Sequence, residues 1–489
     1  MAPVSYESFL QNKMQLGTND GFEPLWIPDF LFDFQKDLVS WAIQKGRAAI
    51  FADCGLGKTP MQLVWAENIV RKTNKRILIL TPIAVGLQTV SEGKKFSIEC
   101  ERSRDGKLPK SKIVITNYEQ LSKFDPNDFI GVICDESSIL KHFSGTTQKE
   151  VTRFMSKIPY RLLCTATAAP NDYIELGTSS EALGELGYSD MLFRFFKQND
   201  KAKWRQDEVR LARFSNPNDP ILVANGKELG GNYYQKLAYR IAQQIGQWRL
   251  KAHAEVPFWR WVASWARACR KPEDLGYEND GFKLPPLQEN YHIVRAKSPP
   301  DGMLFTLPAF GLGEEREERR RTLNERCEMV AHLVFHKDPA IAWCHLNSEG
   351  NKLEKLIDDS VQVSGADDDE AKEEKINAFL CGQARVLVTK AKIAGFGLNL
   401  QKCANVVTFV THSYESYYQS VRRCWRFGQK KPVTVDIVAT EGEQRVSQNM
   451  ARKAEAAAVM FDNLVKYMNE STILKKSYHP IKTEVPSWL

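Results

Sequence analysis

The stretch "AAIFADCGLGKT", residues 48–59, decides the fold of this chain. A short β-rich apolar run passes through glycines into an amphipathic segment. Such a strand–loop–helix turn lets backbone N–H groups face a phosphate at the helix N-terminus. Lys58 would pair with the β- and γ-phosphates, Thr59 would hold Mg²⁺, and Gly55 and Gly57 would shape the loop. Ala52 replaces the first glycine of the general G-x-x-x-x-G-K-[ST] pattern, so a chance G-K-T in a turn remains the alternative.

Two series of buried strands extend from this loop along the chain. The first series has its strands at 48–53, 76–82, 112–118, 131–136 and 160–167, and the second at 339–345, 361–365, 384–390, 405–410 and 433–439. Amphipathic segments separate the strands, which is typical of parallel sheets covered by helices on both faces. We expect an α/β protein with two doubly wound parallel-sheet lobes. The expected division is a lead-in (1–32), lobe one (33–180), a mainly helical insertion (181–300), lobe two (301–445), and a C-terminal helix and tail (446–489).

Composition limits the possible classes of protein. The chain has 489 residues, 43% of them apolar, and a formal net charge of +7, which is compatible with a polyanionic partner. Its ten cysteines include no C-x-x-C pair, so neither a disulfide framework nor a zinc site is expected, and a reducing cytoplasm is the natural location. No secretory signal or membrane span is evident, and no membrane partner is expected.

A second chemical motif is "VICDESSILK", residues 132–141. An apolar strand here delivers two carboxylates to its C-terminal end, where open α/β sheets place their sites. Asp135 would orient water on Mg²⁺, and Glu136 would polarise the attacking water as a general base. The alternative is that the Asp-Glu pair merely caps the next helix.

Seven segments in order resemble the helicase-type ATPases of superfamily two, and most of all the Swi/Snf branch of double-stranded DNA translocases. They are "FQKDLVSWAIQKGRAAIFADCGLGKT", "LILTPIAVGLQ", "VITNYEQL", "DESS", "RLLCTATAAPND", "GFGLNLQKCANVV" and "QSVRRCWRFGQ". The resemblance covers roughly 33–178 and 325–445 and implies two RecA-like lobes that close around ATP and Mg²⁺.

The resemblance also implies roles for individual residues. Gln35 would contact adenine, residues 165–167 would couple the nucleotide site to the nucleic-acid groove, and Gly395 and Gly397 would line the ATP cleft. In the last segment, Arg423 and Arg426 would reach the γ-phosphate as arginine fingers, with Gln419 and Gln429 as the other fixed points. Arg422 matches no fixed position. If the segment is helical, Arg422 points about 100° away from Arg423 and is expected to be a surface or groove charge.

The chain departs from the family at several positions. Cys54 stands where eukaryotic remodelers usually have an acid, Gln88-Thr89 replace a usual tryptophan, and Ser137-Ser138 argue against a DEAD-box RNA helicase. With only 446–489 after lobe two, the chain is expected to be similar to the compact, DEAD/DEAH-box helicase-like Swi/Snf proteins of bacteriophages and prophages.

In the insertion, Trp259, Trp261 and Trp265 alternate with cations. The tryptophans are expected to form the insertion's core. For the cations (Arg260, Arg267, Arg270, Lys271), phosphate contact and a solvated face both remain open. We expect a monomeric, ATP-dependent double-stranded DNA translocase. The alternatives are a strand-separating DNA or RNA helicase of the same superfamily and a non-catalytic nucleic-acid-binding scaffold.

Overall fold

The computed structural model describes residues 19–82, 85–141, 143, 145–169, 172–198, 223–224, 227–228, 248–279, 281–295, 312–335, 338–394, 400–411 and 413–477. The chain forms two compact units. The larger unit comprises Met1–Glu185 and Arg260–Leu489, and it contains both predicted lobes. The smaller unit is Leu186–Trp259.

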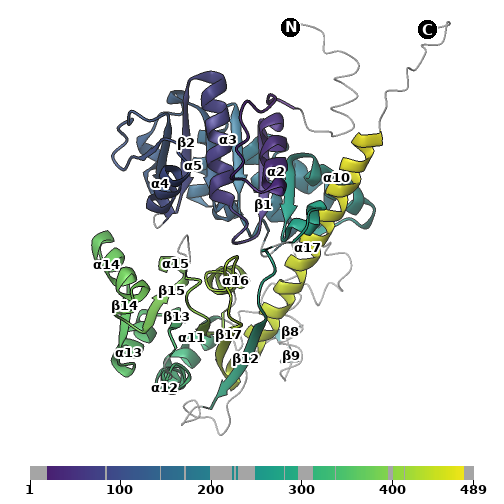
Figure 1. Ribbon diagram of the computed structural model, residues 1–489. Helices are drawn as coiled ribbons and strands as arrows, with labels where there is room; N and C mark the ends of the chain where they lie inside the picture. Colours follow the sequence, from purple (N-terminus) through teal and green to yellow (C-terminus); the bar gives the residue numbers. More distant parts are fainter. Residues whose placement is uncertain are drawn as a thin grey trace, which may run out of the picture. The chain divides into compact units, whose positions relative to one another are not determined.

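Lobe one, whose strands β1 and β2 are labelled in Figure 1, is built on a seven-stranded sheet in the order β11-β1-β6-β5-β2-β4-β3. Every neighbouring pair is parallel. The five predicted strands are confirmed as β1, β2, β4, β5 and β6. The strands are β1 Arg47–Ala52, β2 Arg76–Thr81, β3 Cys100–Arg102, β4 Ile113–Asn117, β5 Phe129–Asp135, β6 Tyr160–Cys164 and β11 Ala266–Cys269.

Helices cover both faces of this sheet because its strands are apolar on both sides. On one face, buried residues of α2 and α3 pack with alternate strand residues such as Ile50 and Ile79. On the other face, Met155 of α5 contacts Cys134 of β5, and Trp265 packs edge-on against Phe51 of β1. The helical elements are α2 Asp33–Lys45, α3 Lys58–Thr73, α4 Gly86–Lys95, η2 Tyr118–Lys123, η3 Pro126–Asp128, η4 Ser137–Lys141, α5 Thr146–Met155, η5 Tyr173–Glu175 and α6 Leu176–Leu183.

Lobe two has a six-stranded parallel sheet in the order β12-β17-β16-β13-β15-β14. Helices α14, α16 and α17 cover one face, and α12 and α13 cover the other. The strands are β12 Leu287–Val294, β13 Ala340–Cys344, β14 Ser360–Val363, β15 Val386–Lys390, β16 Asn405–Phe409 and β17 Val433–Thr440. The helices are α11 Leu312–Arg321, α12 Leu323–Leu333, α13 Asn347–Leu356, α14 Asp369–Leu380, α15 Ala391–Ala394, α16 Tyr414–Val421, η9 Glu441–Glu443 and α17 Gln444–Ser477. The short helix η8, Pro272–Leu275, follows β11, and its Leu275 packs against the core of lobe one. The predicted fold class, two parallel α/β lobes, is confirmed.

The described part of the segment 181–300 includes strands that were not expected in a mainly helical insertion. Its strand β11 adds to the edge of the lobe-one sheet beside β1, and β12 adds to the edge of the lobe-two sheet beside β17. Strand β11 is only four residues long and most side chains of β12 are exposed, so the sequence pattern gave weak strand signals. Helix α10, Glu255–Trp265, buries Trp259, Trp261 and Trp265, but Trp265 packs against Phe51 of lobe one and not in a core of the insertion's own.

The described residues of the smaller unit form short strands, the helix α7 and the short helix η7 before α10. Phe258 contacts Phe195 and Phe196 edge-on, with ring centroids 5.5 Å apart in each pair, and these rings form its described core. Strands β7 and β10 pair antiparallel, as do β8 and β9. Its other elements are α7 Tyr188–Phe195, β7 Phe196–Gln198, β8 Val223–Ala224, β9 Lys227–Glu228, β10 Trp248–Leu250 and η7 Ala252–Ala254.

The long helix α17 contacts both lobes. Its Met450 belongs to the core of lobe two. Further along, Asp462 pairs with Arg270, and the Met468 carbonyl accepts a hydrogen bond from Arg267 Nη1 at 3.4 Å, next to strand β11 of the lobe-one sheet. No described helix is long and apolar enough to cross a membrane. All ten cysteines are free thiols.

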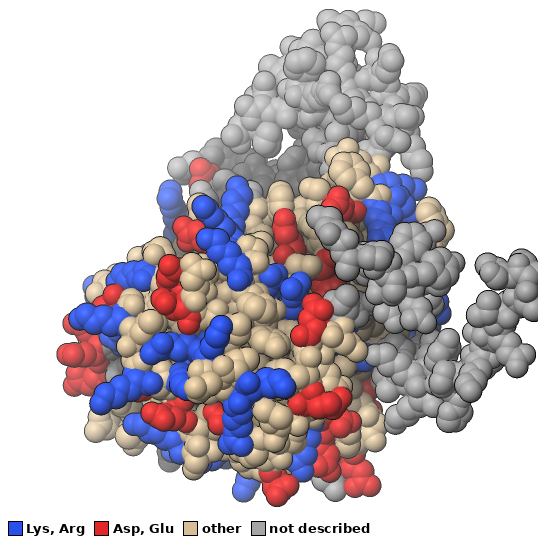
Figure 2. Space-filling view, turned by 90° about the horizontal axis from the view of Figure 1, so that it is seen from above, with Lys and Arg blue, Asp and Glu red and all other residues tan. Residues whose placement is uncertain are grey.

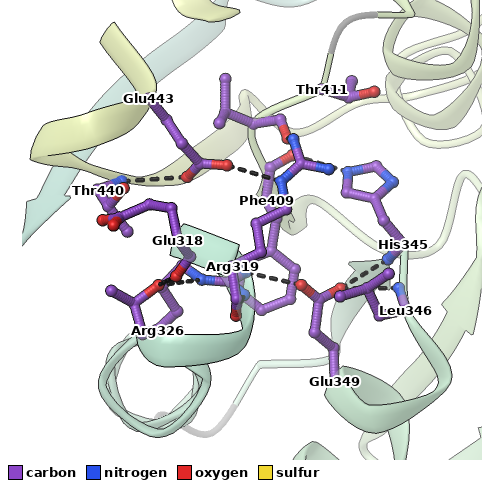
Figure 3. A network of polar contacts seen from close by, with 12 residues as sticks. Glu318, Arg319, Arg326, His345, Leu346, Glu349, Phe409, Thr411, Thr440 and Glu443 are labelled. Atoms are coloured by element: carbon purple, nitrogen blue, oxygen red, sulfur yellow. Dashed lines mark hydrogen bonds and ion pairs between the residues drawn. The ribbon is translucent and has the colours of Figure 1, made fainter. Parts of the chain in front are cut away.

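A buried polar network joins helices of lobe two to the ends of its strands (Figure 3). Arg326 of α12 and Glu349 of α13 form an ion pair of 2.7 Å, and each side chain is 1% exposed. Arg326 also donates to Thr322 Oγ1 and to the Arg319 carbonyl. Glu349 Oε2 accepts from the backbone N–H groups of His345 and Leu346. Nearly all the polar atoms of this pair are therefore satisfied, which is the condition under which a buried ion pair is tolerated.

Glu349→Gln is expected to destabilise the protein by about 3–5 kcal/mol, because it leaves the Arg326 charge buried without a counter-charge. The measurement is the urea unfolding midpoint. Glu354→Gln on the same helix, where the side chain is exposed, is the matched control and should shift the midpoint little. Burial by itself would raise the pKa of Glu349, but Arg326 and His345 hold it below 4.5. The contribution of the pair should therefore be present above the unfolded pKa and be lost as pH falls through the lower folded pKa. Equal midpoints for the two variants would contradict this role.

Candidate nucleotide-binding site

Three loops of lobe one meet at the carboxyl edge of its sheet. β1, β6 and β5 are consecutive parallel strands, so the segments that follow them lie side by side. These segments are the glycine-rich loop 53–57, the Thr-Ala-Thr segment 165–167, and the pair Asp135-Glu136. The sheet order therefore brings together residues that the sequence scatters over more than 100 positions.

The glycine-rich loop requires glycine at two positions. Gly55 and Gly57 have φ of +89° and +75°, a region that favours glycine. A Cβ on Gly57 would stand 2.3 Å from Gln35 Nε2, and one on Gly55 would stand 3.0 Å from the backbone nitrogen of Phe427. Gln35 donates to the Leu56 carbonyl at 2.8 Å and accepts from the Phe32 N–H at 3.0 Å. Gln35 thus supports the loop directly, while its predicted contact with adenine stays a prediction.

Lys58 begins helix α3 and turns back toward the loop. Its Nζ donates to the carbonyls of Ala52 at 2.9 Å and Asp53 at 3.3 Å. The ammonium group is therefore held over the loop by weak neutral acceptors. A phosphate oxygen is a stronger acceptor for a cation than these carbonyls.

Asp135 and Glu136 lie buried at the end of β5. Burial raises the pKa of both carboxyls, while the positive charges of Lys58 and Arg423 lower it. Gln62 Nε2 donates to Asp135 Oδ1 at 2.7 Å, and Thr165 Oγ1 donates to Glu136 Oε2 at 3.3 Å. Glu136 has φ of +53°, an uncommon conformation for a non-glycine residue. Such backbone strain is often found at functional sites.

Arg423 and Arg426 of lobe two lie at this same site. Arg423 is 6% exposed, and its charge acts on both carboxyls of lobe one. Arg426 is half-buried, and burial together with the nearby Arg423 charge lowers its pKa. The buried Nε of Arg426 has no hydrogen-bond partner among the described residues. The structure thus brings Lys58, Asp135, Glu136 and the two arginines together, which sequence spacing alone could only suggest.

Arg422 is not a surface charge, contrary to expectation. Its side chain is buried, pairs with Asp53 of the glycine-rich loop, and donates to the Cys54 carbonyl at 3.2 Å. Tyr418 O–H donates to the other oxygen of Asp53 at 2.5 Å. The reason is that α16 ends at Val421, so residues 422–429 follow turns and the helical offset from Arg423 does not apply. Asp53, Tyr418 and Arg422 form a direct connection between the lobes.

A second connection between the lobes passes through residues 165–167. The Thr167 N–H donates to Thr165 Oγ1, whose hydroxyl contacts Glu136. Thr167 Oγ1 lies 3.5 Å from Glu415 Oε1 on α16, and Glu415 also pairs with Lys141. A path of hydrogen bonds therefore runs from Glu136 to lobe two, while the coupling role of residues 165–167 stays a prediction.

The donor set fits a magnesium nucleotide. A polyphosphate is suited by the glycine cradle, Lys58, Arg423 and Arg426, whose Nε has no partner among the described residues. Thr59 and Asp135 supply hard oxygen ligands for Mg²⁺. The described residues contain no group of three or more His, Cys, Asp or Glu side chains that could hold a metal. Mg²⁺ would therefore need phosphate and water oxygens to complete its shell, which is its usual mode of binding.

The remaining predicted residues have mixed outcomes. Gln419 is buried on α16, and its Nε2 has no partner among the described residues. Gln429 donates to the carbonyls of Gln401 and Cys403, so it holds a neighbouring loop in place. Gly395 and Gly397 lie outside the described residues.

Most of the cations for which phosphate contact was left open interact with other groups of the protein. Burial lowers the pKa of Arg267 to about 10, Arg270 pairs with Asp462, and Lys271 pairs with Glu273. Arg260 is exposed. On the face shown in Figure 2, lysines and arginines are intermingled with acids over the described residues. That view therefore gives no reason to place a polyanion on this face.

Sequence reasoning missed Asp53, Gln62, Tyr418 and Glu415. Asp53 belongs to the glycine-rich loop and Gln62 to the helix α3 that follows it, and their polar character in an apolar context was an available signal. Tyr418 and Glu415 carried no such signal, because their partners lie in the other lobe.

Comparison with known proteins finds similarity only among solved structures. No family model and no curated protein matches the chain. Among solved structures, it is similar to the Sulfolobus solfataricus SWI2/SNF2 ATPase core in complex with dsDNA, with a TM-score of 0.36 and 16% identity. The likeness covers 92% of this chain and 97% of that chain. At this TM-score we draw no inference about function from it.

Proposed function

We propose that this chain is an ATP-dependent double-stranded DNA translocase that hydrolyses ATP to ADP and phosphate. The observation that carries the proposal is the site just described. There the positive charges of Lys58 of lobe one and Arg423 of lobe two both lower the pKa of the buried carboxyls Asp135 and Glu136. DNA as the partner, monomeric state, cytoplasmic location and similarity to phage proteins remain predictions from the sequence.

Each residue of the site would have its own role in ATP hydrolysis. Lys58 and the loop N–H groups would hold the β- and γ-phosphates, and Glu136 would accept a proton from the attacking water. Mg²⁺, held by Thr59 and Asp135, would neutralise phosphate charge when bound. Arg423 and Arg426 would stabilise charge on the transferred phosphoryl group. Because these arginines belong to lobe two, hydrolysis would be coupled to lobe closure, and the paths through Asp53 and Glu415 would transmit the change.

Two alternatives remain testable. A strand-separating helicase would need an element that splits the duplex, and the sequence offers no candidate. A non-catalytic scaffold would have no physical need to bury Asp135 and Glu136 beside Lys58 and Arg423, because burying charges is costly. The translocase is therefore the function that we favour.

Duplex DNA is expected to stimulate ATP hydrolysis more than single-stranded DNA or RNA of equal length. The stimulation should weaken with salt, with a log–log slope of about −0.9 per phosphate contacted, because binding releases counterions. The measurement is steady-state phosphate release with each nucleic acid over a salt series. Stronger stimulation by RNA would favour the helicase alternative, and no hydrolysis under any condition would favour the scaffold.

A further inference from the structure

Residues of β12, α16 and α17, three elements labelled in Figure 1, line a cavity in lobe two that is separate from the phosphate loop. Its volume is about 370 Å³, within the range of small-molecule pockets. Five aromatic side chains line it: Tyr291, Tyr414, Tyr417, Tyr418 and Trp425. So many rings around one small cavity offer stacking faces to a flat ligand.

The polar groups of the cavity specify the ligand further. Arg422 lines the cavity and is 4% exposed, and its Nε has no hydrogen-bond partner among the described residues. A buried donor of this kind calls for an acceptor. The Arg422 guanidinium already lies over the Trp425 and Tyr418 rings, 4.9 and 5.6 Å from their centroids. The Arg422 guanidinium therefore already fills the place over these rings that a cationic ligand would take. The remaining space suits a neutral ring that carries a hydrogen-bond acceptor for Arg422 Nε.

The opening of the cavity carries a negative charge. Glu289 and Tyr291 are exposed, and Glu289 accepts a hydrogen bond from Tyr417 O–H. This carboxylate can accept a hydrogen bond from a ring N–H or an amino group, and it repels phosphate. Neutral planar rings with both donors and acceptors at their edges are the chemistry of nucleobases. We propose that this cavity binds a free nucleobase or nucleoside.

A ligand bound in the cavity would affect the phosphate-binding loop. Arg422 and Tyr418 line the cavity, and both also contact Asp53 of that loop. A ligand that accepts from Arg422 Nε would fix the guanidinium against Asp53. This coupling rests on the proposed function, whereas binding itself does not.

The test is calorimetric titration of the full chain with adenosine, guanosine, cytidine and thymidine, with saturating ADP and Mg²⁺ present to fill the phosphate site. At least one nucleoside should bind, and Ala454→Phe, which fills the cavity from α17, should weaken that binding by about tenfold or more, the scale of losing a stacked base. Ala456→Phe is the matched control, because Ala456 is exposed on the same helix and does not line the cavity. Its affinity should stay near that of the unmodified chain.

Three results would overturn the proposal. They are the absence of nucleoside binding to folded protein, equal affinities of the Ala454→Phe and Ala456→Phe variants, and binding of a single-stranded homopolymer without any binding of free nucleosides. Because heat of binding is measured, an inactive ATPase would count against the proposed function and leave this test intact.

Discussion

Lys58→Ala is expected to lower kcat for ATP by about 10²–10³-fold or more, because the phosphates lose their charge partner in the transition state. ATP affinity should fall too, since Lys58 contacts the same phosphates before reaction. The measurement combines kcat with the Kd of a fluorescent ATP analogue. Lys72→Ala, an exposed lysine on the same helix α3, is the matched control and should leave both quantities near those of the unmodified chain.

Glu136→Gln separates binding from chemistry. The amide oxygen can still accept the hydrogen bond from Thr165, but it cannot take a proton from water, so kcat should fall by about 10²–10⁴-fold while nucleotide affinity is kept. If Glu136→Gln binds nucleotide as poorly as Lys58→Ala, the division of roles between these two residues is wrong.

The central strands could be predicted because parallel strands covered on both faces are continuous apolar runs. All ten predicted strands are present, from β1 to β17. The strands β11 and β12 escaped prediction because β11 has only four residues and β12 is largely exposed. In β12 five of the eight side chains are exposed, so the apolar run typical of a buried strand is missing. Only the neighbouring strand, distant in sequence, specifies them.

In the site, too, only the residues that belong to local sequence patterns could be predicted. Lys58, Asp135 and Glu136 were predictable because local strand-to-loop patterns place such residues at a sheet edge. Arg422 was not, since its partner Asp53 is 369 positions away and no local pattern encodes the pairing. The assumption that helix α16 continues through residue 429 added to the error. Periodicity describes a side chain's direction only while the helix lasts.

Arg423→Ala and Arg426→Ala are each expected to lower kcat on the order of 10³-fold with ATP affinity largely kept. The reason is that charge on the transferred phosphoryl group is the interaction that strengthens most in the transition state. The measurement is kcat at saturating ATP and duplex DNA, with affinity determined separately. Arg295→Ala is the matched control, because Arg295 lies on lobe two and its side chain is 87% exposed in a surface ion pair with Glu441.

Arg422→Ala should fail in a different way. It leaves Asp53 buried without its cation inside the phosphate-binding loop, so nucleotide affinity should fall together with kcat. Arg423→Lys should recover only part of the lost kcat, because an ammonium keeps the charge but loses the planar fork of the guanidinium. If Arg423 served packing alone, the alanine and lysine variants would differ mainly in the stability of the protein and would show no such order of kcat values. If Arg423→Ala lowers affinity as much as Arg422→Ala does, Arg423 holds the loop and does not act on the reacting phosphate.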